Sequence, residues 1–94
     1  MKIDVYLNNL YDIYKNLLTE KEISNFEDYY FNDLSLKEIA LNNKISRNAI
    51  FKRLKNISNK LKDYENKLEL YKKKNKINSL IKDEKLLEKI NEIL

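Results

Sequence analysis

The chain has 94 residues, enough for one small domain, and it contains no Gly, Pro or Cys. The absence of Cys excludes disulfides and thiolate metal sites and suits a reducing compartment, so we expect a cytoplasmic protein. The formal net charge of +4 is unevenly distributed: residues 1–43 carry −4, residues 44–76 carry +9, and residues 77–94 carry −1.

Two helices are predicted in the N-terminal part, over about residues 3–18 and residues 20–31. The first has apolar side chains at alternating spacings of four and three, which places them on one face. These residues are Ile3, Leu7, Leu10, Tyr14 and Leu17, widened by Tyr6, Ile13 and Leu18. Thr19 and Glu22 form a predicted capping box for the second helix. Its predicted inward residues are Ile23, Phe26, Tyr30 and Phe31.

A short third helix is predicted over about residues 36–42. Ser35 and Glu38 form its capping box, and its inward residues are Leu36, Ile39 and Ala40. The next two residues, Asn43 and Lys44, form a turn in which one residue needs a positive φ angle. Without Gly one of these two must adopt it, and Asn tolerates that conformation better than Lys, so Asn43 is favoured.

A long fourth helix is predicted from Arg47 to about Lys74, with Ser46 as its cap. Its apolar residues alternate in spacing between four and three, as in a coiled-coil seam. They are Ile50, Leu54, Ile57, Leu61, Tyr64, Leu68 and Tyr71. We expect a break over residues 75–79 and a final helix with an apolar stripe of Leu80, Ile81, Leu87, Ile90 and Leu94. The seam predicts a homodimer, or else cover by the first and last helices of the same chain.

Residues 36–55 have the pattern of a helix-turn-helix, in which the second helix can lie in the major groove of DNA. The predicted fold is therefore an all-α bundle with a long fourth helix and a C-terminal helix. We predict one domain over residues 1–94, with a helix-turn-helix core at 19–58 and a helical extension at 59–94. The charge step between residues 43 and 44 places the cations on the second helix of the motif and its extension, as a surface that meets phosphates requires.

Six residues of the fourth helix are candidates for nucleic-acid binding: Arg47, Asn48, Phe51, Lys52, Arg53 and Lys55. Arg47 could form a bidentate pair with guanine, and Asn48 could pair with adenine. The other three cations could contact phosphates. Phe51 is open to several interpretations: a contact with a thymine methyl, stacking on an unpaired RNA base, insertion into a protein groove, or partial burial against the second or third helix.

Catalysis is not predicted, because the chain has no His, no Cys and no Gly-rich phosphate loop. Acids such as Glu20 and Glu22 are two residues apart and do not face each other on a helix, so no metal or other cofactor is expected. No apolar run approaches the ~20 residues that cross a bilayer, and polar residues near the start argue against a signal peptide. The alternatives to DNA reading are a helix-turn-helix scaffold that serves as a docking surface, and a merely solvated Lys-rich helix.

Residues 37–71 resemble the YlxM-like helix-turn-helix proteins of Gram-positive bacteria and mycoplasmas. The similarity extends back to residue 10, and it rests on the segments LLTEKE, DYYFNDLSLKEIA, SRNAIFKRLK and KDYENKLELY. The resemblance implies a fold similar to the DNA-reading region 4 of sigma factors and a role as a regulator or accessory component. We predict a nucleic-acid ligand, with DNA favoured over RNA. The resemblance also implies a link to the signal recognition particle, because genes of this family commonly neighbour those of the particle. The alternative is an accessory protein that binds the particle's RNA or GTPase without reading DNA.

Overall fold

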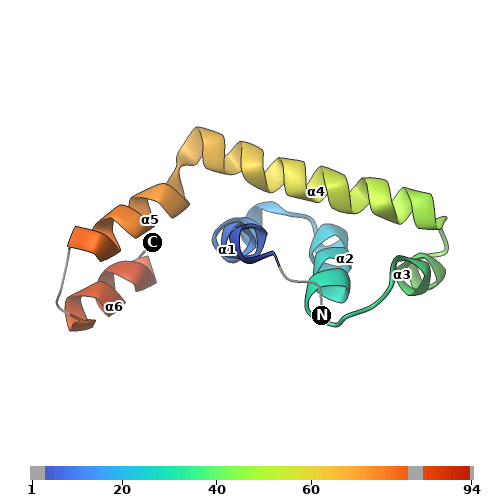
Figure 1. The fold of residues 1–94 in the computed structure, drawn as a ribbon, viewed down its shortest axis with the longest axis horizontal. Helices are drawn as coiled ribbons and strands as arrows, with labels where there is room; N and C mark the ends of the chain where they lie inside the picture. The colour runs from blue at the N-terminus through green and yellow to red at the C-terminus, as the bar shows by residue number, and fades with distance from the viewer. Residues whose placement is uncertain (1–3, 81–83, 94) are drawn as a thin grey trace.

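The computed structural model describes residues 4–80 and 84–93, and within them it contains helices and no strand. The elements are α1 (Val5–Tyr14), a 3₁₀ turn (Lys15–Leu17), α2 (Glu20–Tyr30), α3 (Leu36–Asn43), α4 (Arg47–Leu68), α5 (Leu70–Leu80) and α6 (Glu84–Ile93). The predicted all-α fold is confirmed. The long helix α4 lies along one side, α1 to α3 pack beneath it, and α5 and α6 form an arm beyond its end (Figure 1). Ile3, Ile81, Leu94 and the side chain of Leu87 lie outside the described residues.

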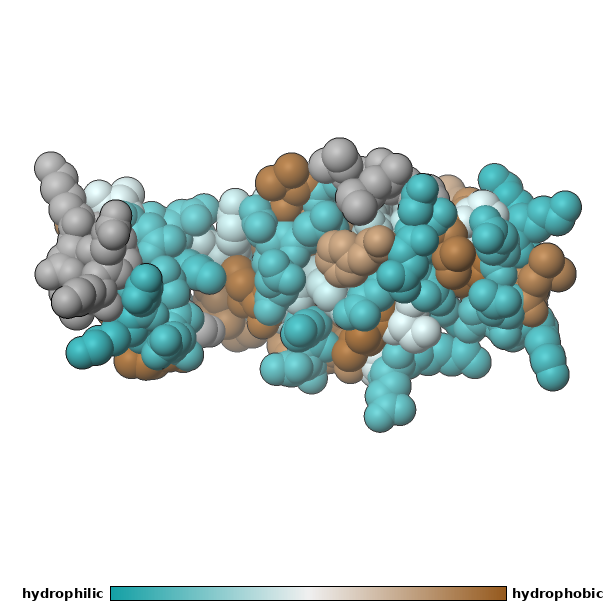
Figure 2. Space-filling view, turned by 90° about the horizontal axis from the view of Figure 1, so that it is seen from below, coloured by the Kyte–Doolittle hydropathy of each residue, from teal (hydrophilic) through white to brown (hydrophobic). Residues whose placement is uncertain are grey.

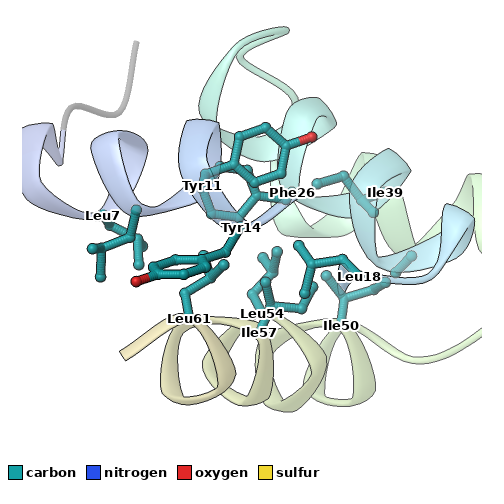
Figure 3. Close-up of a cluster of buried hydrophobic side chains, with 12 residues drawn as sticks. Leu7, Tyr11, Tyr14, Leu18, Phe26, Ile39, Ile50, Leu54, Ile57 and Leu61 are labelled. Atoms are coloured by element: carbon teal, nitrogen blue, oxygen red, sulfur yellow. The ribbon is translucent and has the colours of Figure 1, made fainter. Parts of the chain in front are cut away.

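The core lies between α4 and the three helices before it. Ile50, Ile57 and Leu61 of α4 have no exposed surface, and Leu54 is also buried. Side chains of α1, α2 and α3 cover this stripe, as Figure 3 shows. Burial of each such side chain contributes about 1.5–3 kcal/mol. The seam from residue 50 to residue 61 is therefore covered within one chain, and α2 and α3 take the place that the sequence analysis gave to the last helix.

Both predicted capping boxes are present. The Thr19 hydroxyl accepts a hydrogen bond from the amide of Glu22 at 3.1 Å, and the Glu22 carboxylate accepts one from the amide of Thr19 at 2.9 Å. Ser35 and Glu38 repeat the arrangement at the start of α3. Glu22 also meets Lys60 of α4 at 3.0 Å. Partial burial alone would raise the pKa of Glu22, but the hydrogen bonds from Thr19 and Lys60 outweigh it and hold the pKa below its usual value.

The first helix ends earlier than predicted. α1 ends at Tyr14 and is followed by a 3₁₀ turn, in which the amide of Leu18 donates a hydrogen bond to the carbonyl of Lys15 at 3.0 Å. The tighter winding rotates Leu17 outward, where it is 52% exposed, so its predicted inward position was wrong. Tyr11, which the spacing did not select, is buried instead and stacks on Phe26 with ring centroids 4.2 Å apart.

The turn between α3 and α4 places the positive φ angle at Lys44 (57°) and not at Asn43, which the sequence favoured. Asn43 stays helical because its side chain is held in place. Its amide group donates to the carbonyl of Ile39 at 2.7 Å, and its carbonyl oxygen accepts from Asn25 at 3.2 Å. The next residue must therefore turn the chain.

The predicted continuation of the fourth helix to residue 74 was wrong. α4 ends at Leu68, Glu69 adopts a φ angle of 53°, and α5 begins at Leu70. The break is held by the side chains of Tyr14 and Glu65 and the first amides of α5, here named the Tyr14–Glu65 cluster. It thus precedes by several residues the break expected over residues 75–79.

The Tyr14–Glu65 cluster joins α1 to α4 and satisfies the first three amides of α5. The Tyr14 hydroxyl donates to Glu65 at 2.6 Å and accepts from the amide of Leu70 at 3.0 Å. The Glu65 carboxylate, 8% exposed, also accepts from the amides of Tyr71 and Lys72 at 3.0 and 3.2 Å. A carboxylate at the start of a helix satisfies amides that have no partner in the helix itself. The cluster thus anchors the arm to α1.

Tyr14→Phe tests this anchor, because it removes the hydroxyl and keeps the ring. One Glu65 oxygen and the amide of Leu70 would lose a buried partner, so the free energy of unfolding should fall by about 1–3 kcal/mol. Urea unfolding followed by circular dichroism measures the change.

The control is Tyr6→Phe, since Tyr6 lies on the same helix and is 46% exposed. Alkaline pH gives a second readout. Burial and the hydrogen bond to Glu65 raise the pKa of Tyr14 from 10.0 to about 12. Its contribution to stability is therefore complete below pH 10 and is lost as the pH rises towards 12. Tyr14→Phe should show a smaller alkaline loss than the unmodified protein, and equal effects of the two substitutions would contradict this role.

Candidate nucleic-acid interface

Five of the six predicted binding residues lie exposed on the first turns of α4. They are Arg47, Asn48, Phe51, Lys52 and Lys55, named here the reading face. Ser46 begins the helix, and its hydroxyl accepts from the amide of Ala49 at 3.0 Å. Three residues, 44–46, join α3 to α4, a connection of the length found in helix-turn-helix motifs. In Figure 1, α3 lies beneath the start of α4, and no other helix of the described residues lies on the outer side of α4 there.

The helical repeat divides the reading face into two parts. Asn48 and Lys52 point away from the buried side of α4, because they lie about half a turn from Ile50 and Leu54. Arg47, Phe51 and Lys55 follow one another every four residues along the flank that faces the end of α2 and the start of α3. Asn48 and Lys52 thus form an outer row. Beside it runs a second row, in which the ring of Phe51 lies between the cations of Arg47 and Lys55.

Arg53, the sixth predicted residue, is placed differently. It is half-buried, and its Nη1 atom donates to the side-chain oxygen of Asn25 at 2.8 Å. Asn25 is 1% exposed and also donates to Asn43. This chain of hydrogen bonds joins α4, α2 and α3 and holds the two helices of the motif together. Sequence reasoning missed Asn25, because nothing in the spacing of polar residues on α2 distinguishes it.

Two lysines further along α4 form ion pairs, in contrast to the cations of the reading face. Lys60 pairs with Glu22 at 3.0 Å, and Lys67 pairs with Asp63 at 2.9 Å. Within residues 4–80 and 84–93 no such pair neutralises a cation of the reading face. The first turns of α4 therefore carry exposed positive charge with no carboxylate partner among the described residues.

The lysine run of residues 72–76 continues the positive charge on α5. Lys72, Lys73 and Lys76 are exposed, whereas Lys74 is half-buried beside Asp12 and Ile13 of α1. On the side of the molecule seen from below, apolar areas are scattered among polar ones (Figure 2), as on an ordinary protein surface.

Other kinds of site find little support in the described part of the chain. Within it no three acidic side chains gather as metal ligands. No helix found there is both long enough and apolar enough to cross a bilayer. The reading face is thus the strongest candidate site among the described residues.

Comparison with known proteins identifies the family. The family model described as "Putative helix-turn-helix protein, YlxM / p13 like" (UPF0122) matches residues 1–93. A UPF0122 protein of Malacoplasma penetrans is 58% identical over 50 residues, which cover 53% of this chain and 47% of that protein. One from Fusobacterium nucleatum is 51% identical over 51 residues, 54% of this chain and 50% of that protein. One from Ureaplasma parvum serovar 3 is 43% identical over 91 residues, 94% of this chain and 92% of that protein.

The chain spans about half the length of the first two relatives and nearly all of the Ureaplasma protein. Their names state a family and no ligand. The resemblance found in the sequence is confirmed by a family model that covers almost the whole chain and by a relative similar over almost its whole length. The chain belongs to the UPF0122 family of YlxM/p13-like helix-turn-helix proteins.

Proposed function

We propose that this protein binds nucleic acid through the reading face and that duplex DNA is its preferred ligand. We also propose that it has no catalytic activity. The observation that carries the proposal is the set of exposed cations and the one exposed amide on the first turns of α4, in a chain of a helix-turn-helix family. Among the described residues these cations have no carboxylate partner. A surface of this kind meets the phosphates and base edges of a duplex.

Each residue of the reading face has a role in this proposal. Arg47 forms a bidentate pair with guanine, and Asn48 pairs with adenine. Lys52 and Lys55 contact phosphates, and Phe51 contacts a thymine methyl. Arg53 donates a hydrogen bond to Asn25, so it helps to orient α4 and also adds positive charge to the surface.

The wider role that we propose is regulatory. The resemblance to YlxM-like proteins implies a fold like region 4 of sigma factors and a cytoplasmic regulator of transcription around the signal recognition particle pathway. The charge difference between residues 1–43 and 44–76 supports the DNA-binding part of this role.

A salt titration with a duplex of about three helical turns tests the proposal. Each phosphate contact should contribute about −0.9 to the slope of log K against log salt concentration. Substitution of Lys52 and Lys55 together by Ala should therefore make the slope shallower by about 1.8. Arg47→Ala should reduce discrimination at one base pair by about 1–3 kcal/mol.

Lys60→Ala is the matched control, because Lys60 is a lysine of the same helix that is already paired with Glu22. It should leave the slope nearly unchanged. A slope near zero for the unmodified protein, or an equal change for Lys60→Ala and the reading-face variants, would count against the proposal.

A second candidate function is that of an accessory protein of the signal recognition particle. The exposure of Phe51, 52%, favours it, since unpaired RNA bases stack on such rings. The immobilised protein is incubated separately with the particle's RNA and with its GTPase. This candidate requires that at least one of them is retained and that Phe51→Ala weakens retention; retention of neither removes it.

Homodimer formation stays a prediction from the sequence. The buried part of the seam on α4 is covered within one chain, so a second copy would pack on other surfaces. A dimer with two reading faces would contact DNA half-sites about 34 Å apart, one turn of the double helix. Sedimentation equilibrium at micromolar concentration should give twice the chain mass of 11.4 kDa, and a single species at the chain mass would exclude the dimer.

A further inference from the structure

An apolar pocket opens beside the reading face, between the end of α2, the start of α3 and the middle of α4. Its walls come from all three helices. The lining residues are Tyr29, Tyr30, Leu36, Phe51, Leu54, Lys55 and Ser58. Two of them, Phe51 and Lys55, also belong to the reading face, so the pocket and the proposed nucleic-acid surface are continuous.

The size of the pocket limits its occupant. Its volume is about 170 Å³, whereas pockets for whole small molecules typically occupy ~300–1,000 Å³. The pocket therefore suits one planar ring or one apolar side chain, and it is too small for a complete cofactor.

Aromatic rings form part of the pocket wall, and other aromatic side chains pack against them. The rings of Tyr29 and Tyr30 meet edge to face with centroids 5.0 Å apart. Tyr30 also packs with its ring centroid 4.6 Å from that of Phe26, which is fully buried. Opposite, Phe51 is half-exposed and free to meet a ring that enters. Such fixed aromatic surfaces bind planar groups at little cost in side-chain entropy.

Charge distinguishes the possible occupants. Lys55 lines the pocket, and Lys52 lies one helical turn after Asn48 on the adjoining outer row of the reading face. Within the described residues neither lysine has a carboxylate partner. An apolar side chain of a partner protein would leave both cations unused, whereas a nucleotide offers a planar base together with flanking phosphates.

From this juxtaposition we infer that the pocket binds one unpaired base of the nucleic acid held by the reading face. The inference rests on the proposed function and narrows the ligand to a nucleic acid with an unpaired position. The base stacks on the aromatic walls, and Lys55 contacts a phosphate next to it.

Two probes of one sequence test the inference: a fully paired duplex, and the same duplex with a single unpaired 2-aminopurine, each made as DNA and as RNA. Stacking on aromatic side chains should tighten binding of the second probe by roughly 5- to 150-fold. The fluorescence of 2-aminopurine should fall on binding, because stacking quenches it. The DNA and RNA versions show which backbone the pocket accepts.

Tyr29→Leu removes a stacking ring and keeps apolar bulk, so it should abolish the preference for the unpaired base while the paired duplex still binds. Tyr29→Phe should retain the preference, which separates lost stacking from lost folding. Tyr6→Leu is the matched control on α1, outside the pocket.

Equal binding of the two probes would overturn the inference while leaving the proposed function intact. A preference that survives Tyr29→Leu would also overturn it. Failure of both probes to bind the unmodified protein would overturn the inference together with the proposed function.

Discussion

Burial of one apolar stripe on α4 is the constraint on which the other features depend. Three short helices gather on Ile50, Leu54, Ile57 and Leu61, because none of them could bury its own apolar face alone. Once this side of α4 is fixed in the core, the opposite side must face water. Asn48 and Lys52 are exposed for this reason, since a residue half a turn away from a buried side chain points away from the core.

Polar interactions set the details that the apolar core leaves open. Hydrophobic burial is not directional, so it fixes which side of a helix is inside and leaves the angle between helices loosely specified. The hydrogen bonds from Arg53 to Asn25 and from Asn25 to Asn43 are directional, and they link three helices at one point. They fix the orientation of α4 against α3, on which the direction of the reading face depends. The half-buried contact of Arg53 thus acts by placing other residues of α4.

The arm shows the same division between apolar and polar contributions. The heptad spacing continues through Tyr64, Leu68 and Tyr71, and by itself it favours one unbroken helix. The Tyr14–Glu65 cluster overrides it, since buried groups with satisfied hydrogen bonds outweigh the modest strain of one residue with positive φ at Glu69. The bend turns α5 back towards α1, so Tyr71 packs against the core while Leu68 is left 43% exposed.

The sequence by itself determined the helical content, both capping boxes, the buried stripe of α4 from Ile50 to Leu61 and the four polar residues of the reading face. These features depend on contacts within one helix turn or on the period of the helix. Both can be read from the spacing of residues along the sequence. Only the tertiary structure decided the break at Glu69, the turn at Lys44, the inward position of Tyr11 and the engagement of Arg53. Each of these depends on a partner from another helix: Tyr14 lies 51 residues from Glu65, and Asn25 lies 28 residues from Arg53. Contacts at such separations leave no periodic signal in the chain, because any of many polar residues could have supplied them.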